Sequence, residues 1–177
     1  MNYIKKQINI IIDRDPSIRN SFDAMLCPCF KALLFYKIAH FFYKRKHFFI
    51  SRFLSEKAKR KTGIEIHPGA IIGDGLFIDH GTGVVIGETA IVGNNVTMFH
   101  GVTLGGSGTP SSKKKRHPTV GNNVFIGCGA KLLGDITIGD NVKIGANAVV
   151  LKDVPSNVTV VGVPTKVVKI DGKRVDI

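Results

Sequence analysis

The sequence predicts an α+β fold in which N-terminal helices precede a parallel β-helix with one extruded loop. Three observations predict it: apolar residues at helical spacing in the first third, an aliphatic residue at every sixth position afterwards, and one glycine-rich interruption of that repeat. We therefore expect a helical region over 1–61, a β-helix domain over 62–168 with its loop at 105–119, and a C-terminal tail over 169–177.

The first 61 residues have the pattern of amphipathic helices, with apolar residues three and four positions apart and basic residues between them. The apolar residues are Phe30, Leu33, Leu34, Ile38, Phe41 and Phe42. We expect their side chains to form one buried face. We expect an earlier helix to open at Asp15-Pro16 or Ser17, because Pro suits a first helical turn and Asp suits its positive end.

After Thr62 the chain follows a strict six-residue repeat. Its aliphatic positions are Ile66, Ile72, Ile78, Ile86, Val92, Met98, Leu104, Val120, Ile126, Leu132, Ile138, Ile144 and Val150. A second inward-pointing residue is expected four positions later, as at Ala70, Thr82 and Ala90. A short strand followed by a turn of Gly or Asn makes one face of a triangular coil. Roughly four such coils stack into a parallel β-helix, which we expect to be left-handed.

The repeat is broken at two places. It slips by two residues at Val84-Val85, and it stops over 105–119, where Gly, Ser, Pro and basic residues have the composition of a loop. Because function is often placed on interruptions of a rigid repeat, we expect the loop to take part in the site.

The net charge of +12 is concentrated at the N-terminus, where residues 1–61 hold 14 Lys and Arg against 4 Asp and Glu. A solvated helix face explains this charge, and attraction of an anionic ligand is the alternative. We find no nucleic-acid motif, signal peptide or membrane span, so we expect a cytoplasmic protein. Cys27, Cys29 and Cys128 lack zinc-site spacing and are expected to be ordinary thiols, with a Cys-Pro-Cys redox pair as the alternative.

Several local motifs in this order closely resemble serine acetyltransferases, over nearly the whole chain. They are Asp13-Arg14-Asp15-Pro16, Glu65-Ile66-His67-Pro68, Asp79-His80-Gly81-Thr82-Gly83, Gly87-Glu88-Thr89, Leu104-Gly105-Gly106, Arg116-His117-Pro118 and Gly162-Val163-Pro164. The resemblance implies transfer of acetyl from acetyl-CoA to the L-serine hydroxyl, which gives O-acetylserine for cysteine biosynthesis. It implies no metal.

His80 is the candidate catalytic base. A serine hydroxyl is a weak nucleophile at neutral pH, and an imidazole within hydrogen-bond reach can take its proton. In the family that it resembles, the His of this motif has that role. Glu65 stands where the family has an Asp that orients the base, and the 15-residue separation from His80 is close to one coil. We therefore expect Glu65 and His80 to lie on adjacent turns.

Four further residues match the positions at which the family binds the acceptor amino acid. Asp15 and Asp79 are expected to meet its ammonium group, and Arg116 and His117 its carboxylate. A helix cap is the alternative role for Asp15, and membership of the solvated basic run is the alternative for Arg116.

The resemblance also implies a path for CoA. Gly105, Gly106, Ser107 and Ala130 fall where relatives lay the pantetheine arm, since missing side chains let a ligand approach the backbone. A backbone amide there is expected to stabilise the oxyanion. Lys143 is expected to meet a CoA phosphate, with a plain surface lysine as the alternative.

Other functions remain open at this point. An O-acetyltransferase of a sugar or other small alcohol is the main alternative, and a γ-type zinc carbonic anhydrase using His80, His100 and His117 is a weaker one. A scaffold role rests on the C-terminal Ile177, because the family's last residue inserts into O-acetylserine sulfhydrylase. The resemblance implies a homotrimer or a dimer of trimers, with sites between subunits.

Overall fold

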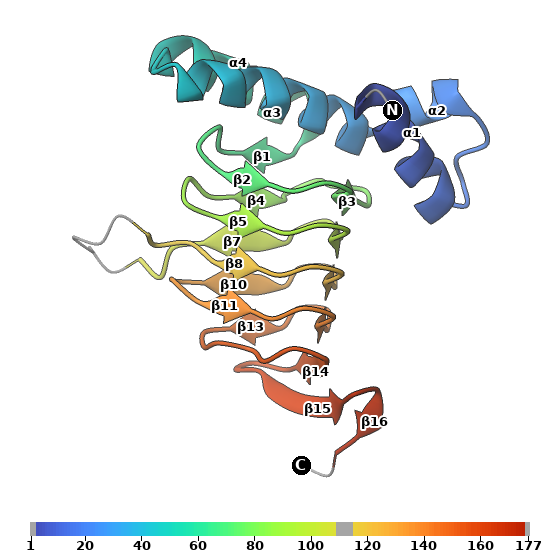
Figure 1. The fold of residues 1–177 in the computed structure, drawn as a ribbon, viewed down its shortest axis with the longest axis vertical. Coiled ribbons are helices and arrows are strands. Elements are labelled where there is room, and N and C mark those ends of the chain that lie inside the picture. The colour runs from blue at the N-terminus through green and yellow to red at the C-terminus, as the bar shows by residue number, and fades with distance from the viewer. Residues whose placement is uncertain (1–2, 109–114, 176–177) are drawn as a thin grey trace.

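The computed structural model describes residues 3–108 and 115–175 of the chain. Within them, four helices lie at one end and a three-sided prism of short strands extends away from them toward the C-terminus (Figure 1). The helices are α1 (Tyr3–Arg14), α2 (Ser21–Leu26), α3 (Pro28–Lys44) and α4 (Phe48–Thr62). The predicted order of helices followed by parallel coils is confirmed.

Local sequence explains where the helices begin and end. Pro28 opens α3, and Gly63, at φ 71°, ends α4 in the left-handed conformation after a basic last turn. The expected helix start at Asp15 is wrong. Asp15 lies in the turn after α1 and accepts from the backbone N–H of Ser17 at 2.9 Å, whereas Asn20 caps α2.

The buried face of α3 differs in part from the predicted one. Phe30 and Leu33 are buried as expected, but Ile38 and Phe41 are 44% and 48% exposed. The buried face instead runs through small residues and one tyrosine: Cys29, Ala32, Tyr36 and Ala39. Small side chains let the helix lie close to the first coil, and a pattern of large apolar residues does not predict that choice.

Sheets A and B form two sides of the prism, and their strands are parallel throughout. Sheet A contains β1 (Glu65–Ile66), β4 (Val85–Ile86), β7 (Thr103–Gly105), β10 (Lys131–Leu133) and β13 (Val149–Val150). Sheet B contains β2 (Ile71–Ile72), β5 (Ile91–Val92), β8 (Thr119–Val120) and β11 (Thr137–Ile138).

Sheet C forms the third side and ends differently. It contains β3 (Phe77–Ile78), β6 (Thr97–Met98), β9 (Phe125–Ile126), β12 (Lys143–Ile144), β14 (Val158–Val161), β15 (Lys166–Ile170) and β16 (Lys173–Arg174). The first five are parallel, whereas β15 and β16 pair antiparallel. No repeat or motif in the sequence predicts these two strands. Because they cover the edge of β14, that edge is not left open.

The register confirms the six-residue repeat. Ile66 pairs with Ile86, and Ile86 with Leu104. Leu132 pairs with Leu104 and with Val150. All thirteen aliphatic positions of the repeat point inward, and twelve of them are buried, Ile72 being only partly so. Successive coils therefore stack one aliphatic side chain on the next along each inner edge of the prism.

The two-residue slip widens one corner of the first coil, between β3 and β4. Thr82, expected to point inward, is exposed, and the buried position is taken by Val84. His80 occupies the widened corner with φ 57°, a left-handed conformation that is uncommon for residues other than Gly and Asn. The irregularity that the repeat showed in sequence thus places the candidate base outside the coil.

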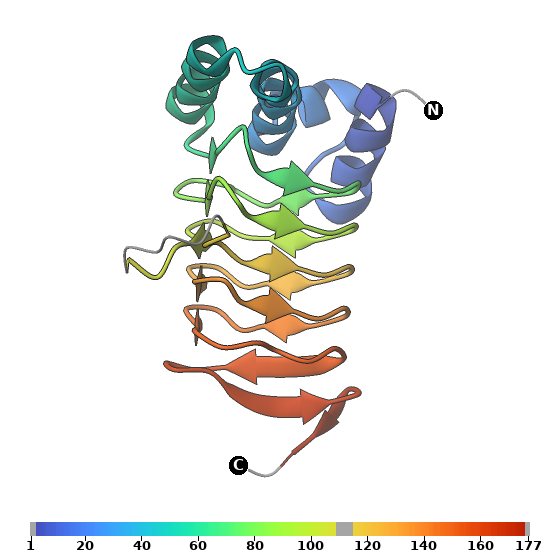
Figure 2. The same ribbon diagram turned by 60° about the vertical axis from the view of Figure 1, so that its left-hand side comes forward.

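Helix α1 lies beside the first coils, against sheet C, and α2 packs on α1 and α3 (Figure 2). The buried amide of Gln7 donates to the carbonyl of Leu76 at 2.8 Å, and Arg14 donates to Gly75 and Thr97, both at 3.1 Å. These bonds fix α1 against sheet C, directly before Asp15. Among the described residues, no helix combines the length and apolar character needed to cross a bilayer.

Candidate active site

Asp79 and His80 lie at the corner between sheets C and A, here named the base corner. Asp79 follows β3 and is half-buried, and its backbone N–H donates to Met98 at 2.9 Å. Asp15 arrives from the end of α1. Burial raises the pKa of the Cys27 thiol, and the negative charges of Asp15 and Asp79 add to that increase, so both carboxylates lie near enough to this thiol to act on it. The structure thus places Asp79 and His80 together, and Asp15 in the turn after α1, a helix that contacts β3.

The His80 side chain is exposed and contacts another histidine. The rings of His80 and His100 meet edge to face, with their centroids 5.9 Å apart. His100 comes from the next coil, because β3 pairs with β6. A base at this position has its ring open to solvent and to a substrate.

Glu65 lies in β1, where its carboxylate is 2.6 Å from the Lys59 ammonium group at the end of α4. Glu65 opens the first coil and His80 stands near that coil's end. The ion pair between Glu65 and Lys59 was not predicted from the sequence. Its predicted role as the partner of His80 stays a prediction.

Glu88, Thr89, Arg116 and His117 gather at the corner between sheets A and B, here named the loop corner. The Thr89 hydroxyl accepts from the backbone N–H groups of Arg116 at 3.0 Å and His117 at 3.2 Å. The Thr89 backbone N–H donates to His117 Nδ1 at 3.1 Å. Since Nδ1 accepts that bond, the neutral ring carries its proton on Nε2.

His117 is only 8% exposed. Burial lowers the pKa of its imidazole, and the positive charges of Arg116 and Lys115 lower it further. A Cβ atom at Gly87 would overlap the His117 ring, so the glycine of Gly87-Glu88-Thr89 makes room for the imidazole. His117 is therefore a neutral, tightly held donor at neutral pH.

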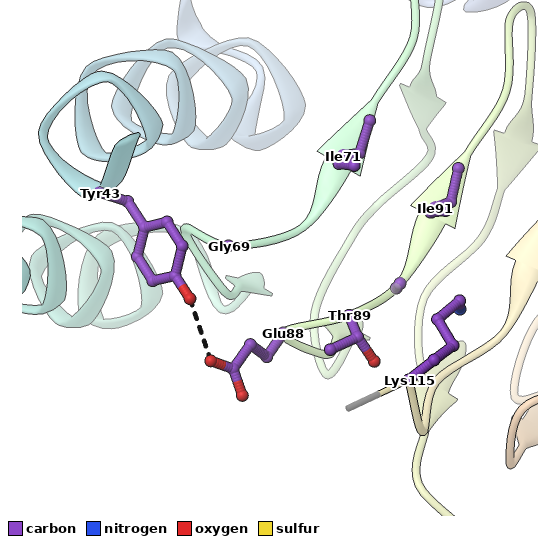
Figure 3. A pocket seen from close by; sticks show the side chains of 8 residues that line it. Tyr43, Gly69, Ile71, Glu88, Thr89, Ile91 and Lys115 are labelled. Carbon is purple, nitrogen blue, oxygen red and sulfur yellow. Dashed lines mark hydrogen bonds between the residues drawn. The ribbon is translucent and has the colours of Figure 1, made fainter. Parts of the chain in front are cut away.

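A pocket of about 500 Å³ lies beside the loop corner (Figure 3). Its apolar floor includes Ile71 and Ile91 on sheet B, and Lys115 stands at one side. At the other side the Tyr43 hydroxyl, from α3, donates to Glu88 at 3.0 Å. Glu88 also pairs with Arg116 at 3.2 Å, so one carboxylate connects a helix, a coil and the base of the loop.

The two corners lie at opposite edges of sheet A. The base corner is between β3 and β4, and the loop corner is between β4 and β5 in one coil and between β7 and β8 in the next coil. Strand pairing therefore assigns the acceptor-binding residues to two groups on different edges of the prism.

The predicted CoA residues do not share one surface. Gly105 ends β7, and Gly106 and Ser107 follow it toward the loop. The Ala130 side chain is fully buried, and its backbone N–H donates to Gly127. Lys143 is exposed on β12 of sheet C. The glycine stretch has the open backbone that a pantetheine arm needs, whereas Lys143 lies on another side of the prism.

Comparison with known proteins decides the family. Residues 117–152 match the model described as bacterial transferase hexapeptide (six repeats). A serine acetyltransferase of Synechococcus elongatus is 55% identical over 168 residues, which cover 94% of this chain and 68% of that protein. The chain belongs to the serine acetyltransferase family.

Solved structures of the family have the same fold. A Brucella abortus serine acetyltransferase in complex with coenzyme A is 42% identical, with a TM-score of 0.89, covering 95% of this chain and 67% of that one. A Neisseria gonorrhoeae serine acetyltransferase in complex with serine is 42% identical, with a TM-score of 0.86, covering 93% and 67%. The left-handed β-helix and the resemblance predicted from sequence are confirmed.

Sequence reasoning missed two residues that hold this family member's loop corner. Tyr43 gave no signal, because it is 45 positions from Glu88 and lies in a basic helix. Thr89 belongs to the Gly87-Glu88-Thr89 motif, and the motif alone does not predict that its hydroxyl accepts two hydrogen bonds from the loop. A small hydroxyl residue after Gly-Glu was the available signal for Thr89.

The alternative zinc site would use three histidines, and within one chain the structure places them at two different corners. His80 and His100 share the base corner, whereas His117 is at the loop corner. Over residues 3–108 and 115–175, no cluster of three or more His, Cys, Asp or Glu side chains is arranged to hold a metal ion.

Proposed function

We propose that this protein transfers the acetyl group of acetyl-CoA to the hydroxyl of L-serine, which yields O-acetyl-L-serine and CoA for cysteine biosynthesis. The observation that carries the proposal is 55% identity to a serine acetyltransferase over 94% of the chain. Relatives in complex with serine and with coenzyme A support both substrates. The charges at the two corners also suit a zwitterion better than a neutral sugar.

In the proposed reaction, His80 takes the proton of the serine hydroxyl while its oxygen attacks the thioester carbonyl carbon. The carbon–sulfur bond then breaks, and the imidazolium returns its proton to the CoA thiolate. Asp15 and Asp79 bind the ammonium group of serine, and Arg116 and His117 bind its carboxylate. The exposure of the His80 ring supports this role, because the base must meet a diffusing substrate.

We place the pantetheine arm along Gly105, Gly106 and Ser107, beside Ala130. A backbone N–H of this stretch would donate to the oxyanion that forms on the thioester carbonyl. Lys143 is proposed to meet a phosphate of CoA, and its position on sheet C requires the cofactor to reach round the prism or to come from a neighbouring subunit.

We infer a homotrimer in which each site joins the base corner of one subunit to the loop corner of the next. The separation of the two groups on one chain supports this arrangement, because a single serine must touch both. A dimer of trimers, a cytoplasmic location and a complex with O-acetylserine sulfhydrylase are further proposals. The last depends on Ile177, which lies outside the described residues.

The test measures release of CoA thiol from acetyl-CoA with L-serine, L-homoserine, a galactoside or no acceptor, for wild type and His80→Ala. Serine-dependent release that falls by about a hundredfold or more in the variant supports the reaction and the base. Release with the galactoside alone would mean that the acceptor substrate is a sugar and not serine. Release unaffected by His80→Ala would remove His80 from the mechanism.

A further inference from the structure

We propose that Tyr43 and Glu88 are positioning residues that hold the Arg116 guanidinium in place for the carboxylate of serine. This inference rests on the proposed function and adds to it a specific source of serine affinity. It links the helical region to the loop across the pocket of Figure 3.

The contacts form a continuous chain from helix to loop. The Tyr43 hydroxyl donates to Glu88 Oε1 at 3.0 Å, and Arg116 Nη2 donates to Glu88 Oε2 at 3.2 Å. Each carboxylate oxygen of Glu88 thus has a different partner. The Arg116 backbone is fixed as well, because its N–H donates to the Thr89 hydroxyl at 3.0 Å.

Tyr43 is itself held from several sides. Its ring packs edge to face against Phe48, with centroids 5.3 Å apart, and against His67, at 5.8 Å. A Cβ atom at Gly69 would lie 2.9 Å from the Tyr43 hydroxyl oxygen and 3.2 Å from Glu88 Cγ. The absence of a side chain at Gly69 therefore lets the tyrosine reach the carboxylate.

The electrostatics fit a fixed donor. Burial raises the pKa of Tyr43, and the hydrogen bond to Glu88 raises it further, so the hydroxyl keeps its proton at neutral pH. The Arg116 and Glu88 side chains are 57% and 37% exposed, and exposed ion pairs alone stabilise little. A third anchor on Glu88 restricts the rotamers of the pair before substrate binds, which lowers the entropic cost of binding.

Arg116 has donors to spare for serine. A guanidinium group presents five N–H bonds, and Glu88 receives one of them from Nη2. The remaining donors can bind a carboxylate in the bidentate geometry that arginine favours. Since that contact is the same before and during acetyl transfer, its loss should affect KM for serine more than kcat.

The experiment compares Tyr43→Phe with Tyr36→Phe. Both tyrosines lie in α3 and donate to the β-helix domain, but Tyr36 donates to the Ala70 carbonyl, at 2.7 Å, and not to Glu88. Steady-state kinetics are measured with L-serine and with L-serinamide, which lacks the carboxylate, after each variant is shown to be folded by its thermal transition.

We expect Tyr43→Phe to raise KM for L-serine about fivefold, with kcat and KM for acetyl-CoA within about twofold of wild type. With L-serinamide, Tyr43→Phe and wild type should have the same KM. Tyr36→Phe should leave KM for L-serine unchanged. Glu88→Gln, which turns an acceptor into a donor facing Arg116, should raise KM for L-serine by at least as much.

Three results would overturn the inference: an equal KM increase in Tyr36→Phe, an equal increase with L-serinamide, or an unchanged KM for L-serine in both Tyr43→Phe and Glu88→Gln. The first result would mean that the Tyr43–Glu88 hydrogen bond only helps to hold α3 on the β-helix. A wild-type enzyme without serine-dependent activity is a separate outcome, which rejects the proposed function and this inference with it.

Discussion

Gly87 shows how a missing side chain sets the site at the scale of one residue. A methyl group there would overlap the His117 ring, so we expect Gly87→Ala to displace the imidazole and lower kcat/KM for serine by about tenfold or more. Steady-state kinetics measure the loss.

Gly145→Ala is the matched control for this prediction. Gly145 follows Ile144 as Gly87 follows Ile86, but its Cβ would meet the side chain of Val161, 2.8 Å away, two coils beyond His100. Equal losses of kcat/KM in the two variants would mean that the backbone, and not His117, responds to the methyl group.

The buried His117 also makes stability depend on pH. Its pKa is lowered below the ordinary value of 6.5, first by burial, so below about pH 6.5 the unfolded state binds more protons than the folded state. The stability that depends on the neutral ring is present above that pH and is lost as the pH falls toward the folded-state pKa. The pKa of His67 is lowered in the same direction.

We expect the melting temperature to fall between about pH 7.5 and pH 5.5, and to fall less in His117→Asn, whose amide oxygen can still accept from Thr89. Differential scanning calorimetry at the two pH values measures this. Identical decreases in wild type and variant would assign the effect to other groups.

Individual residues differ in how well sequence predicts their role. His80 and Arg116 were found because their neighbours match family motifs, and the structure adds that His80 has φ 57°. Tyr43 was not found, because its partner is distant in the chain and a tyrosine in a helix has no distinctive pattern. Side-chain contacts between elements need the packing of those elements, which local sequence does not contain.

At the scale of elements, the side-chain amides of Asn95, Asn123 and Asn141 form a hydrogen-bonded ladder between successive coils. Asn123 has φ 56°, accepts from Asn95 Nδ2 at 3.3 Å and donates to Asn141 Oδ1 at 3.2 Å. Asn123→Ala loses both bonds, and alanine tolerates the left-handed conformation less well than asparagine, so we expect a loss of about 1 to 3 kcal/mol in the free energy of unfolding.

Asn123→Gly separates the two causes, because glycine adopts this conformation without strain. We expect it to destabilise less than Asn123→Ala in urea unfolding. A larger loss with glycine would show that backbone entropy outweighs strain at this turn.

Element-level prediction succeeded where one period dominates. The six-residue repeat fixed the buried positions, since each coil stacks the same position on the next. The repeat failed at Thr82, where two extra residues shift the inward position to Val84. The helical pattern failed at Ile38 of α3, which is exposed. The antiparallel strands β15 and β16 also escaped prediction, because they follow no repeat.

For the whole molecule, the central fact is that the base corner and the loop corner lie at different edges of one prism. The hydrogen-bonded strand order keeps sheet A between them, so neither side-chain rotation nor loop movement at one corner brings His80 to His117. An assembly about a threefold axis can bring the base corner of one subunit to the loop corner of another.

Mixed assemblies test this arrangement. His80→Ala and Arg116→Ala should each be nearly inactive with serine, but co-expressed in equal amounts they should recover roughly a quarter of wild-type activity, since a site that takes its two corners from random neighbours has that chance of being intact. The separately purified variants, assayed together without subunit exchange, are the control. If each site lay within one chain, every site of the mixed protein would carry one defect and no activity would return. Recovery therefore depends on the two corners of a site belonging to different subunits.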